Sequence, residues 1–236
     1  MKDTDVSLDL ETTGLNPKTD KIIEVGAVKV VQGCITDTYA TFVNPGRPLD
    51  ETIIALTGIT QEQVEGAKEP TQMIPELLDF IGSNPLLGHS ILFDYSFVKR
   101  AAVNQSRGFE TTGIDTLRIA RRYLANLESR NLGCLCRYYG IELREHRALE
   151  DATATHLLYQ LLCAHYYKEE TADNIEFQAI PLRYQVKKEG PITKQQKKRL
   201  YELLKEHRIT IAWDVEKLTR NEASRYTDQI LAKYGR

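Results

Sequence analysis

The sequence has few of the features that would place it in a membrane or in an oxidising compartment. Its 236 residues contain no run of about 18 consecutive apolar side chains, the length that a membrane-spanning helix requires. The first residues show no basic stretch followed by an apolar one, so no secretory signal is expected. Only four cysteines are present, and none has the Cys-x-x-Cys spacing of zinc or redox sites. We therefore expect packed, reduced thiols, no membrane association and a cytoplasmic location.

The sequence also lacks a strong overall charge, but its net charge of −2 conceals an uneven distribution. Residues 1–170 carry 17 Lys and Arg against 24 Asp and Glu, a net of −7, whereas residues 187–236 carry 13 against 7, a net of +6. A basic tail behind an acidic body predicts a polyanionic partner for that tail. A solvated helical face would produce the same composition, and charge alone leaves both interpretations open.

Strand-like and helix-like segments alternate along the first two thirds of the chain, which predicts an α/β fold with a mixed sheet. Three β-rich segments with short connections indicate an antiparallel meander, at residues 6–10, 22–31 and 38–43. A short strand is expected at 85–89. Apolar periodicity and capping residues predict helices at 60–63, 71–81, 94–102, 115–124, 132–139 and 148–166.

The same patterns predict where the chain divides. One catalytic-size domain is expected over residues 1–168, ending just beyond the long helix. A linker with one short extended piece at 177–186 is expected over 169–190. A basic helical module is expected over 191–236, with one helix beginning after Pro191 and another after Thr219, whose Glu222 has the capping-box spacing.

Acidic residues occur at the ends of the predicted elements. Asp9 and Glu11 lie two apart on a strand, so both side chains point to the same face. Carboxylates that close repel each other unless a cation lies between them, and oxygen ligands suit Mg²⁺ or Mn²⁺. Asp94 begins one helix, and Asp151 lies early in another, five residues after His146. Each residue alone has an ordinary explanation, as a solvated edge, a helix-dipole partner or a surface histidine.

Their joint order is more specific. The segments at 9–15 (DLETTGL), 88–94 (GHSILFD) and 146–152 (HRALEDA) resemble the three exonuclease motifs of the DEDDh family, which includes bacterial polymerase proofreading subunits and stand-alone exonucleases. Segments 56–60 and 115–117 also match, and the resemblance covers about residues 4–167. It implies a ribonuclease H-like mixed sheet flanked by helices, and a metal-dependent 3′→5′ exonuclease that releases nucleoside monophosphates. One departure is Ser90, where many members have Asn.

The resemblance also implies a role for each acidic residue in hydrolysis assisted by two divalent cations, Mg²⁺ or Mn²⁺. Asp9 is expected to bridge both ions, and Glu11 and Asp151 to hold the ion that carries the attacking water. Asp94 is expected to act through water on the other ion. His146 is expected to be the general base, since imidazole exchanges protons near neutral pH.

The remaining site residues form two groups. The terminal nucleotide is expected to be lined by Thr12, Thr13, Gly14 and Leu15, with Leu15 as a wedge against the base, and His89 and Phe93 either shape this pocket or only pack beside it. The resemblance of the tail to a small module of bacterial nucleic-acid enzymes is loose. The tail has a cationic cluster that would contact phosphates if the tail binds nucleic acid. This cluster consists of Lys194, Lys197, Lys198 and Arg199.

Three functions remain open from the sequence. The first is an exonuclease on single-stranded or 3′-overhang DNA, with a DNA polymerase or repair complex as a candidate partner. The second is an exoribonuclease that trims RNA 3′ ends, because the two share all catalytic residues and the 2′-OH is read by fine contacts. The third is a nucleic-acid-binding module without catalysis, which the intact residue set opposes. Segment 9–14 resembles the proofreading type more closely, so DNA is favoured over RNA.

Overall fold

A six-stranded mixed sheet forms the centre of the molecule. The computed structural model describes residues 4–143, 146–168, 172–211 and 213–235. The strands lie in the order β3-β2-β1-β4-β5-β6. The pairs β1–β2 and β2–β3 are antiparallel. The pairs β1–β4 and β4–β5 are parallel, and β6 pairs antiparallel with β5. Their bounds are β1 Thr4–Thr12, β2 Ile22–Val31, β3 Cys34–Phe42, β4 Leu86–Gly88, β5 Thr112–Asp115 and β6 Ile180–Pro181.

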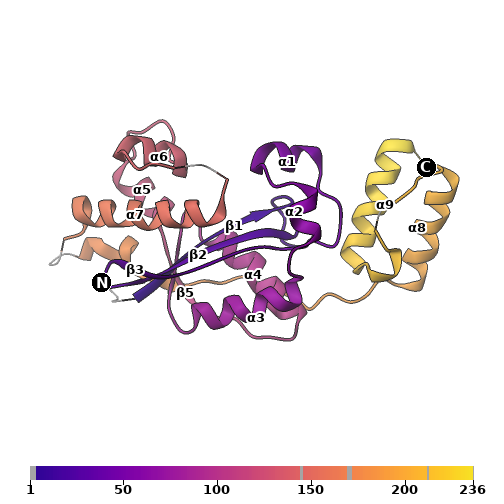
Figure 1. The fold of residues 1–236 in the computed structure, drawn as a ribbon, viewed down its shortest axis with the longest axis horizontal. Helices are drawn as coiled ribbons and strands as arrows, with labels where there is room; N and C mark the ends of the chain where they lie inside the picture. Colours follow the sequence, from indigo (N-terminus) through magenta and orange to yellow (C-terminus); the bar gives the residue numbers. More distant parts are fainter. Residues whose placement is uncertain (1–3, 144–145, 169–171, 212, 236) are drawn as a thin grey trace.

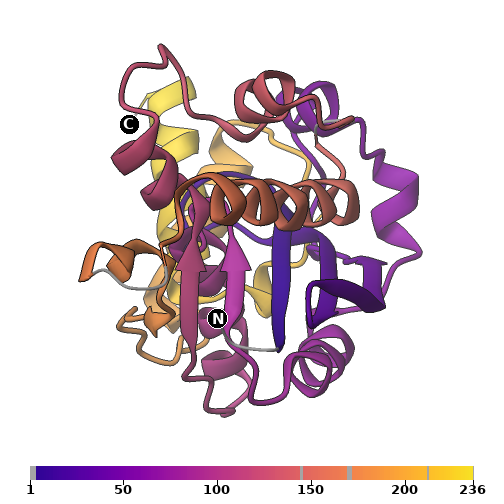
Figure 2. The same ribbon diagram turned by 90° about the vertical axis from the view of Figure 1, so that its left-hand side faces the viewer.

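Helices cover both faces of this sheet (Figures 1 and 2). On one face, α3 and α4 pack against the apolar side chains Val6, Leu8 and Leu10 of β1. On the other face α7 crosses β1 and β2, with α5 and α6 beside it. The helices in the first domain are α1 Glu51–Thr57, α2 Gln61–Glu65, α3 Pro70–Ile81, α4 Leu92–Asn104, α5 Thr116–Tyr123, α6 Leu132–Tyr139 and α7 Ala148–Tyr166.

The alternation of β1 decides which of its residues meet α7. Since Val6, Leu8 and Leu10 face α3 and α4, the residues between them point to the α7 side. Ser7 shows this directly, because its buried hydroxyl donates to the carbonyl of Ala152 in α7 at 2.7 Å. The residues that follow at the same phase, Asp9 and Glu11, therefore lie under the first turns of α7.

Gly26 allows α7 to approach the sheet closely. It is the partner of Asp9 in the β1–β2 register. A Cβ at position 26 would lie 2.1 Å from the backbone of Ala148 and Leu149, so the helix start is in direct contact with the strand backbone. The buried Glu24 carboxylate accepts from the Ala148 amide at 3.2 Å and pairs with Arg147 at 3.0 Å, which fixes the same helix start.

The C-terminal segment forms a separate small hydrophobic cluster, built on Leu200, Leu203, Val215 and Ile230. Its elements are α8 Lys194–Glu206, the 3₁₀ turn η2 Val215–Lys217 and α9 Arg220–Tyr234, and both long helices begin with complete capping boxes. Each such cap stabilises a helix by about 1 kcal/mol. The segment lies beyond one end of the sheet, with α9 nearer to the first domain than α8 (Figure 1).

The connection to this segment runs along the first domain. It contains the 3₁₀ turn η1 Ala172–Phe177 and strand β6, and it adds Phe177 and Leu182 to the cores of the first domain. The short extended piece expected within 177–186 is therefore β6, and it joins the sheet edge. In the described part of the chain, no helix is both long and apolar enough to cross a bilayer.

The α/β architecture with a mixed sheet, the antiparallel meander and the accessory helices are confirmed. The helices expected at 132–139 and 148–166 have those bounds. Helix α1 and strand β5 were not expected, because α1 is short and largely exposed and β5 has only four residues. The third strand begins at Cys34 rather than Thr38, and Cys34 is exposed, so the expectation of packed thiols is wrong for that residue.

Candidate active site

Three carboxylates meet where β1 ends beneath α7. Asp9, Glu11 and Asp151 each offer one oxygen, and these oxygens all lie within 4.8 Å of one another. The strand phase supplies the first two residues, and the close contact at Gly26 brings the helix turn that carries Asp151 over them. Residues separated by about 140 positions thus form one oxygen-rich cluster, as the sequence predicts.

The electrostatics of this cluster favour a bound cation. Burial raises the pKa of Glu11 to about 7, with further increases from the charges of Asp151 and Glu24, while Arg147 acts in the opposite direction. Burial likewise raises the pKa of Asp9 well above the usual carboxyl range, and the neighbouring carboxylates add to this effect. Hard oxygen donors at this spacing fit Mg²⁺ or Mn²⁺, whose charge would reverse the repulsion. The residues present therefore fit a divalent metal centre.

Asp94 lies close to this cluster but outside the group of three. It is in the first turn of α4 and only 4% exposed. Burial raises the pKa of its carboxyl group well above the usual range, opposed by hydrogen bonds from backbone groups of Asp94 and Leu10. Its charge in turn raises the pKa of Asp9. Asp94 thus contributes to the same negative field from the opposite side of β1.

His146 is fixed by its backbone beside Asp151. Its amide donates to Asp151 Oδ2 at 2.9 Å, and its φ of 71° lies in the left-handed region. Histidine adopts this conformation more readily than most residues, but it remains uncommon and often marks a functional position. The residue is half-buried and lies two residues before the first residue of α7, so its backbone joins the loop to the carboxylate cluster.

The loop after β1 is held by a charged residue that the sequence motif does not include. Thr13 Oγ1 accepts from the Lys21 amide at 3.0 Å and from the Arg47 guanidinium, which also pairs with Asp20 at 3.1 Å. A Cβ at Gly14 would lie 2.5 Å from the Asp20 carboxylate, so the loop folds tightly over Asp20. Thr12 donates its hydroxyl to the carbonyl of Gly14 at 2.7 Å.

This anchoring leaves Leu15 outside the protein core, with 83% of its surface exposed. An exposed leucine on a firmly held loop is available for contact with an apolar surface such as a base.

His89 and Phe93 lie farther into the protein. Both ring nitrogens of His89 have protein partners at 2.9 Å, the hydroxyl of Thr116 and the carbonyl of Arg130. Burial lowers the pKa of its imidazole and so favours the neutral form of the ring. The ring of Phe93 packs on that of Phe97, with centroids 5.0 Å apart, at the edge of the main core. Of the two roles left open by the sequence, these contacts favour packing.

The cationic cluster at the head of α8 lies apart from the carboxylates. Lys197 forms an ion pair with Glu216, and Lys198 lies 4.0 Å from Glu202. Lys194 and Arg199 are exposed. The structure brings these four residues together on one helix and does not bring them to the site.

Four residues that hold the site were missed by reasoning from the sequence: Asp20, Glu24, Gly26 and Arg47. Their contacts to the site join positions far apart in the sequence, such as Asp20 with Arg47 and Glu24 with Ala148, so local patterns give little indication of them. The one available signal was Gly26, a glycine inside an otherwise β-branched strand, which often marks the close approach of another backbone.

Fold and carboxylate cluster together define a nuclease of the DnaQ-like exonuclease class. The family model described as Exonuclease (RNase_T) matches residues 6–159, and the chain belongs to this family. The sequence-based prediction of an exonuclease is confirmed at this level.

Related proteins agree with this assignment. The chain is 41% identical over 160 residues to DNA polymerase III of PolC type from Halalkalibacterium halodurans, which covers 66% of this chain and 11% of that protein. It is 37% identical over 151 residues to the PolC-type polymerase of Clostridium perfringens, covering 64% and 10%. The chain thus spans about a tenth of the length of these relatives.

Solved structures of exonuclease I share the fold. One superimposes with a TM-score of 0.64 at 18% identity, covering 69% of this chain and 41% of that one. An Escherichia coli exonuclease I bound to a dA16 oligonucleotide gives 0.63 at 18% identity, covering 70% and 42%. At this identity the likeness concerns the fold alone.

Proposed function

We propose that this chain is a metal-dependent 3′→5′ exonuclease that releases nucleoside monophosphates from the 3′ ends of single-stranded DNA. The observation that carries the proposal is the cluster of Asp9, Glu11 and Asp151 oxygens within 4.8 Å, with His146 held beside it. Like charges that lie close together at a strand end lower the stability of the fold. Binding of a divalent cation for catalysis would explain why they are present.

In this mechanism Asp9, Glu11 and Asp151 would hold two divalent cations, Mg²⁺ or Mn²⁺, and the nearby Asp94 would add negative charge. When bound, the cations supply Lewis acidity at the scissile phosphate and make a water a better nucleophile. His146 accepts the proton of the attacking water through its imidazole. Its backbone hydrogen bond to Asp151 fixes the residue beside the cluster.

The loop after β1 positions the end of the substrate. Thr12, Thr13 and Gly14 line the terminal nucleotide, and Leu15 packs against its base. His89 and Phe93 support the wall of this pocket by packing. Because Arg47 and Asp20 fix the loop before any substrate binds, little ordering is required on binding.

DNA is the preferred substrate in this proposal. The relatives at 37–41% identity are named as DNA polymerases, and the solved exonuclease I complex holds a deoxyoligonucleotide. By the same relationship a DNA polymerase or repair complex in the cytoplasm is the proposed setting. The alternative is an exoribonuclease on RNA 3′ ends, and a binding module without catalysis is a weaker one.

We further propose that the functional units are the exonuclease domain at 1–168, the connection at 169–190 and the helical module at 191–236. The end of α7 at Tyr166 and the separate cluster built on Leu200 support this division.

A time course on 5′-labelled DNA and RNA oligonucleotides of one sequence, with Mg²⁺, with Mn²⁺ and with EDTA, tests the proposal. We expect a ladder that shortens from the 3′ end only with metal, and faster on DNA. Asp79→Ala, which removes an exposed carboxylate from α3, is a matched control for Asp151→Ala. Faster shortening of RNA than of DNA would establish the exoribonuclease instead. The absence of any metal-dependent ladder would refute the proposed exonuclease activity.

A further inference from the structure

A large cleft lies where the first domain meets the C-terminal module. It has a volume of about 850 Å³ and is lined by α4, the connection at 184–190, the start of α9 and Lys18 of the loop after β1. None of the predicted site residues lines it, so it is separate from the carboxylate cluster.

The cleft is strongly basic although the whole chain has a net charge of −2. Six cations line it against two carboxylates, Glu110 and Glu189, which gives a local net charge of +4: Lys18, Lys99, Arg100, Lys187, Lys188 and Arg220. Lys99 pairs with Glu110 and Arg100 pairs with Glu189, so these two cations stabilise the fold. The other four form no ion pair within the described ranges, and their mutual repulsion favours an anionic occupant.

The cleft is built on fixed backbone. Lys18 lies in a turn closed by Asn16, whose side-chain oxygen accepts the Lys18 amide at 3.0 Å and whose carbonyl accepts the Asp20 amide at 2.8 Å. The Lys188 ammonium donates to Ser106 at 2.6 Å. A cationic surface that is already ordered binds phosphates without a large entropic cost.

The wall contributed by the connection is fixed at both of its sides. The Glu189 amide donates to Asn104 of α4 at 3.0 Å, and its carboxylate accepts from Arg100 at 2.6 Å and from Asn221 of α9 at 3.2 Å. The amide of Arg220 donates to the carbonyl of Gly190 at 3.1 Å. The start of α9 therefore completes the cleft, with Arg220 and Asn221 in its lining.

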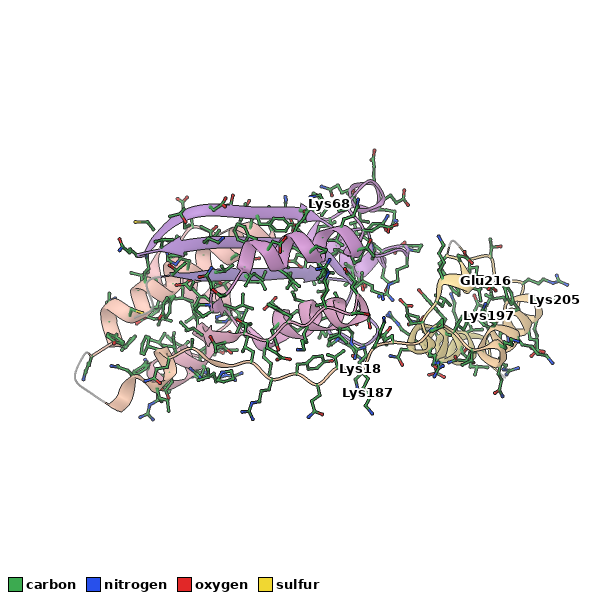
Figure 3. The ribbon with its side chains drawn as sticks, turned by 90° about the horizontal axis from the view of Figure 1, so that it is seen from below. Lys18, Lys68, Lys187, Lys197, Lys205 and Glu216 are labelled. Carbon is green, nitrogen blue, oxygen red and sulfur yellow. The ribbon has the colours of Figure 1, made fainter. Side chains whose placement is uncertain are left out.

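Figure 3 shows how this region differs from the cationic cluster on α8. Lys18 and Lys187 come from segments far apart in the sequence and lie near each other at the junction, whereas Lys197 lies in the module with Glu216. Lys18 also belongs to the loop of Gly14 and Leu15, only three residues beyond Leu15. The loop proposed to line the terminal nucleotide therefore also contributes a cation to the cleft.

We propose that this cleft binds the phosphate backbone of the single-stranded nucleic acid whose 3′ end occupies the carboxylate cluster. The inference rests on the proposed exonuclease function and adds a second binding region to it. Lys18, Lys187, Lys188 and Arg220 contact phosphates, and the module contributes by completing the cleft. Each phosphate contact releases counterions, so binding here falls with salt.

The test measures binding without cleavage, by fluorescence anisotropy of a labelled 20-nucleotide DNA strand in EDTA, across a series of salt concentrations. The variant is Lys18→Gln/Lys187→Gln in the full chain, since neither side chain has a structural partner among the described residues. We expect binding roughly ten- to thirtyfold weaker near 0.1 M salt, and a salt slope smaller by about 1.4, which is two contacts at ~0.7 each. The control Lys205→Gln/Lys217→Gln removes the same charge from exposed positions of the module and is expected to change affinity less than twofold.

An unchanged salt slope in Lys18→Gln/Lys187→Gln, or an equal loss in the control, would overturn the inference. A wild-type protein that binds no strand in EDTA would also overturn it. None of these three results depends on cleavage, because the proposed exonuclease function is judged separately by metal-dependent shortening of 3′ ends.

Discussion

Two groups of buried or half-buried acidic residues lie near the loop after β1, and their surroundings are opposite. Asp9, Glu11 and Asp151 face one another, and burial raises the pKa of Glu11 to about 7. Asp20 instead faces Arg47 at 3.1 Å and Arg225 of α9 at 2.7 Å.

Glu222 belongs to the second group. It pairs with Lys21 at 2.8 Å, and although burial raises the pKa of its carboxyl, Lys21 and Thr219 outweigh this and lower the pKa overall. The first group is a cluster of like charges that suits a cation from solution, whereas the second consists of ion pairs between the first domain and the module. Neighbouring acidic residues thus face like charges in one place and cationic partners in the other, and these partners distinguish the proposed metal site from a stabilising contact.

The largest effect is expected from Asp9→Ala. The exonuclease activity should fall at least about 10³-fold, because several kcal/mol of metal-dependent stabilisation are lost. Thermal unfolding in EDTA should show a melting temperature no lower than that of the wild type. Retained activity would show that Asp9 does not belong to the metal centre. A large fall in melting temperature would show that the first group stabilises the fold, as the second group does.

His146→Ala should reduce kcat about 10²- to 10³-fold, the scale of a lost general base. Mn²⁺ affinity measured by calorimetry should stay within a few-fold, since the carboxylates remain. Cleavage at the wild-type rate would assign the base to another group.

Asp20→Asn should lower stability by about 3 kcal/mol, because the buried guanidinium of Arg47 and the half-buried one of Arg225 lose their carboxylate. For a chain of this length that corresponds to a fall of roughly 6–12 °C in melting temperature. The comparison predicts the opposite sign at the active site. If the melting temperature of Asp20→Asn equals that of the wild type, the contact between the first domain and the module contributes nothing to the stability of the protein.

Gly26→Ala should weaken metal binding about 10- to 100-fold, the usual cost of disturbing groups that position ligands. An added Cβ would overlap the backbone at Ala148 and force α7 away from the sheet. Gly66→Ala is the control, since a Cβ there meets nothing within 4 Å. Equal Mn²⁺ affinity in the two variants would show that the approach of α7 does not set the site.

The smallest effect is expected from Asp9→Asn, which should raise stability in EDTA by about 1 kcal/mol because it relieves repulsion in the first group. Saturating Mg²⁺ should cancel or reverse the difference, since only the wild type gains from binding the ion. A variant less stable than the wild type in EDTA would show that Asp9 is already compensated.

The sequence predicts those parts of the molecule whose causes are local. The capping boxes at Thr60 and Thr219 and the left-handed Gly140 after α6 are readable from a few neighbouring residues. The strand phase likewise places Asp9 and Glu11 on one face. The order of the sheet and the partners of Asp20 depend on contacts between residues far apart in the sequence, such as Asp20 with Arg225. The local periodicity of the sequence does not indicate such contacts.

The close contact at Gly26 also bears on the entropy of ion binding. Where helix and strand backbones touch without an intervening side chain, the separation of Asp9 and Asp151 follows from main-chain geometry, which has few alternative states. The loss of freedom needed to gather these ligands then occurs when the chain folds and not when a cation arrives. Ion binding can therefore proceed with little rearrangement, and each turnover begins from ligands that already stand in place.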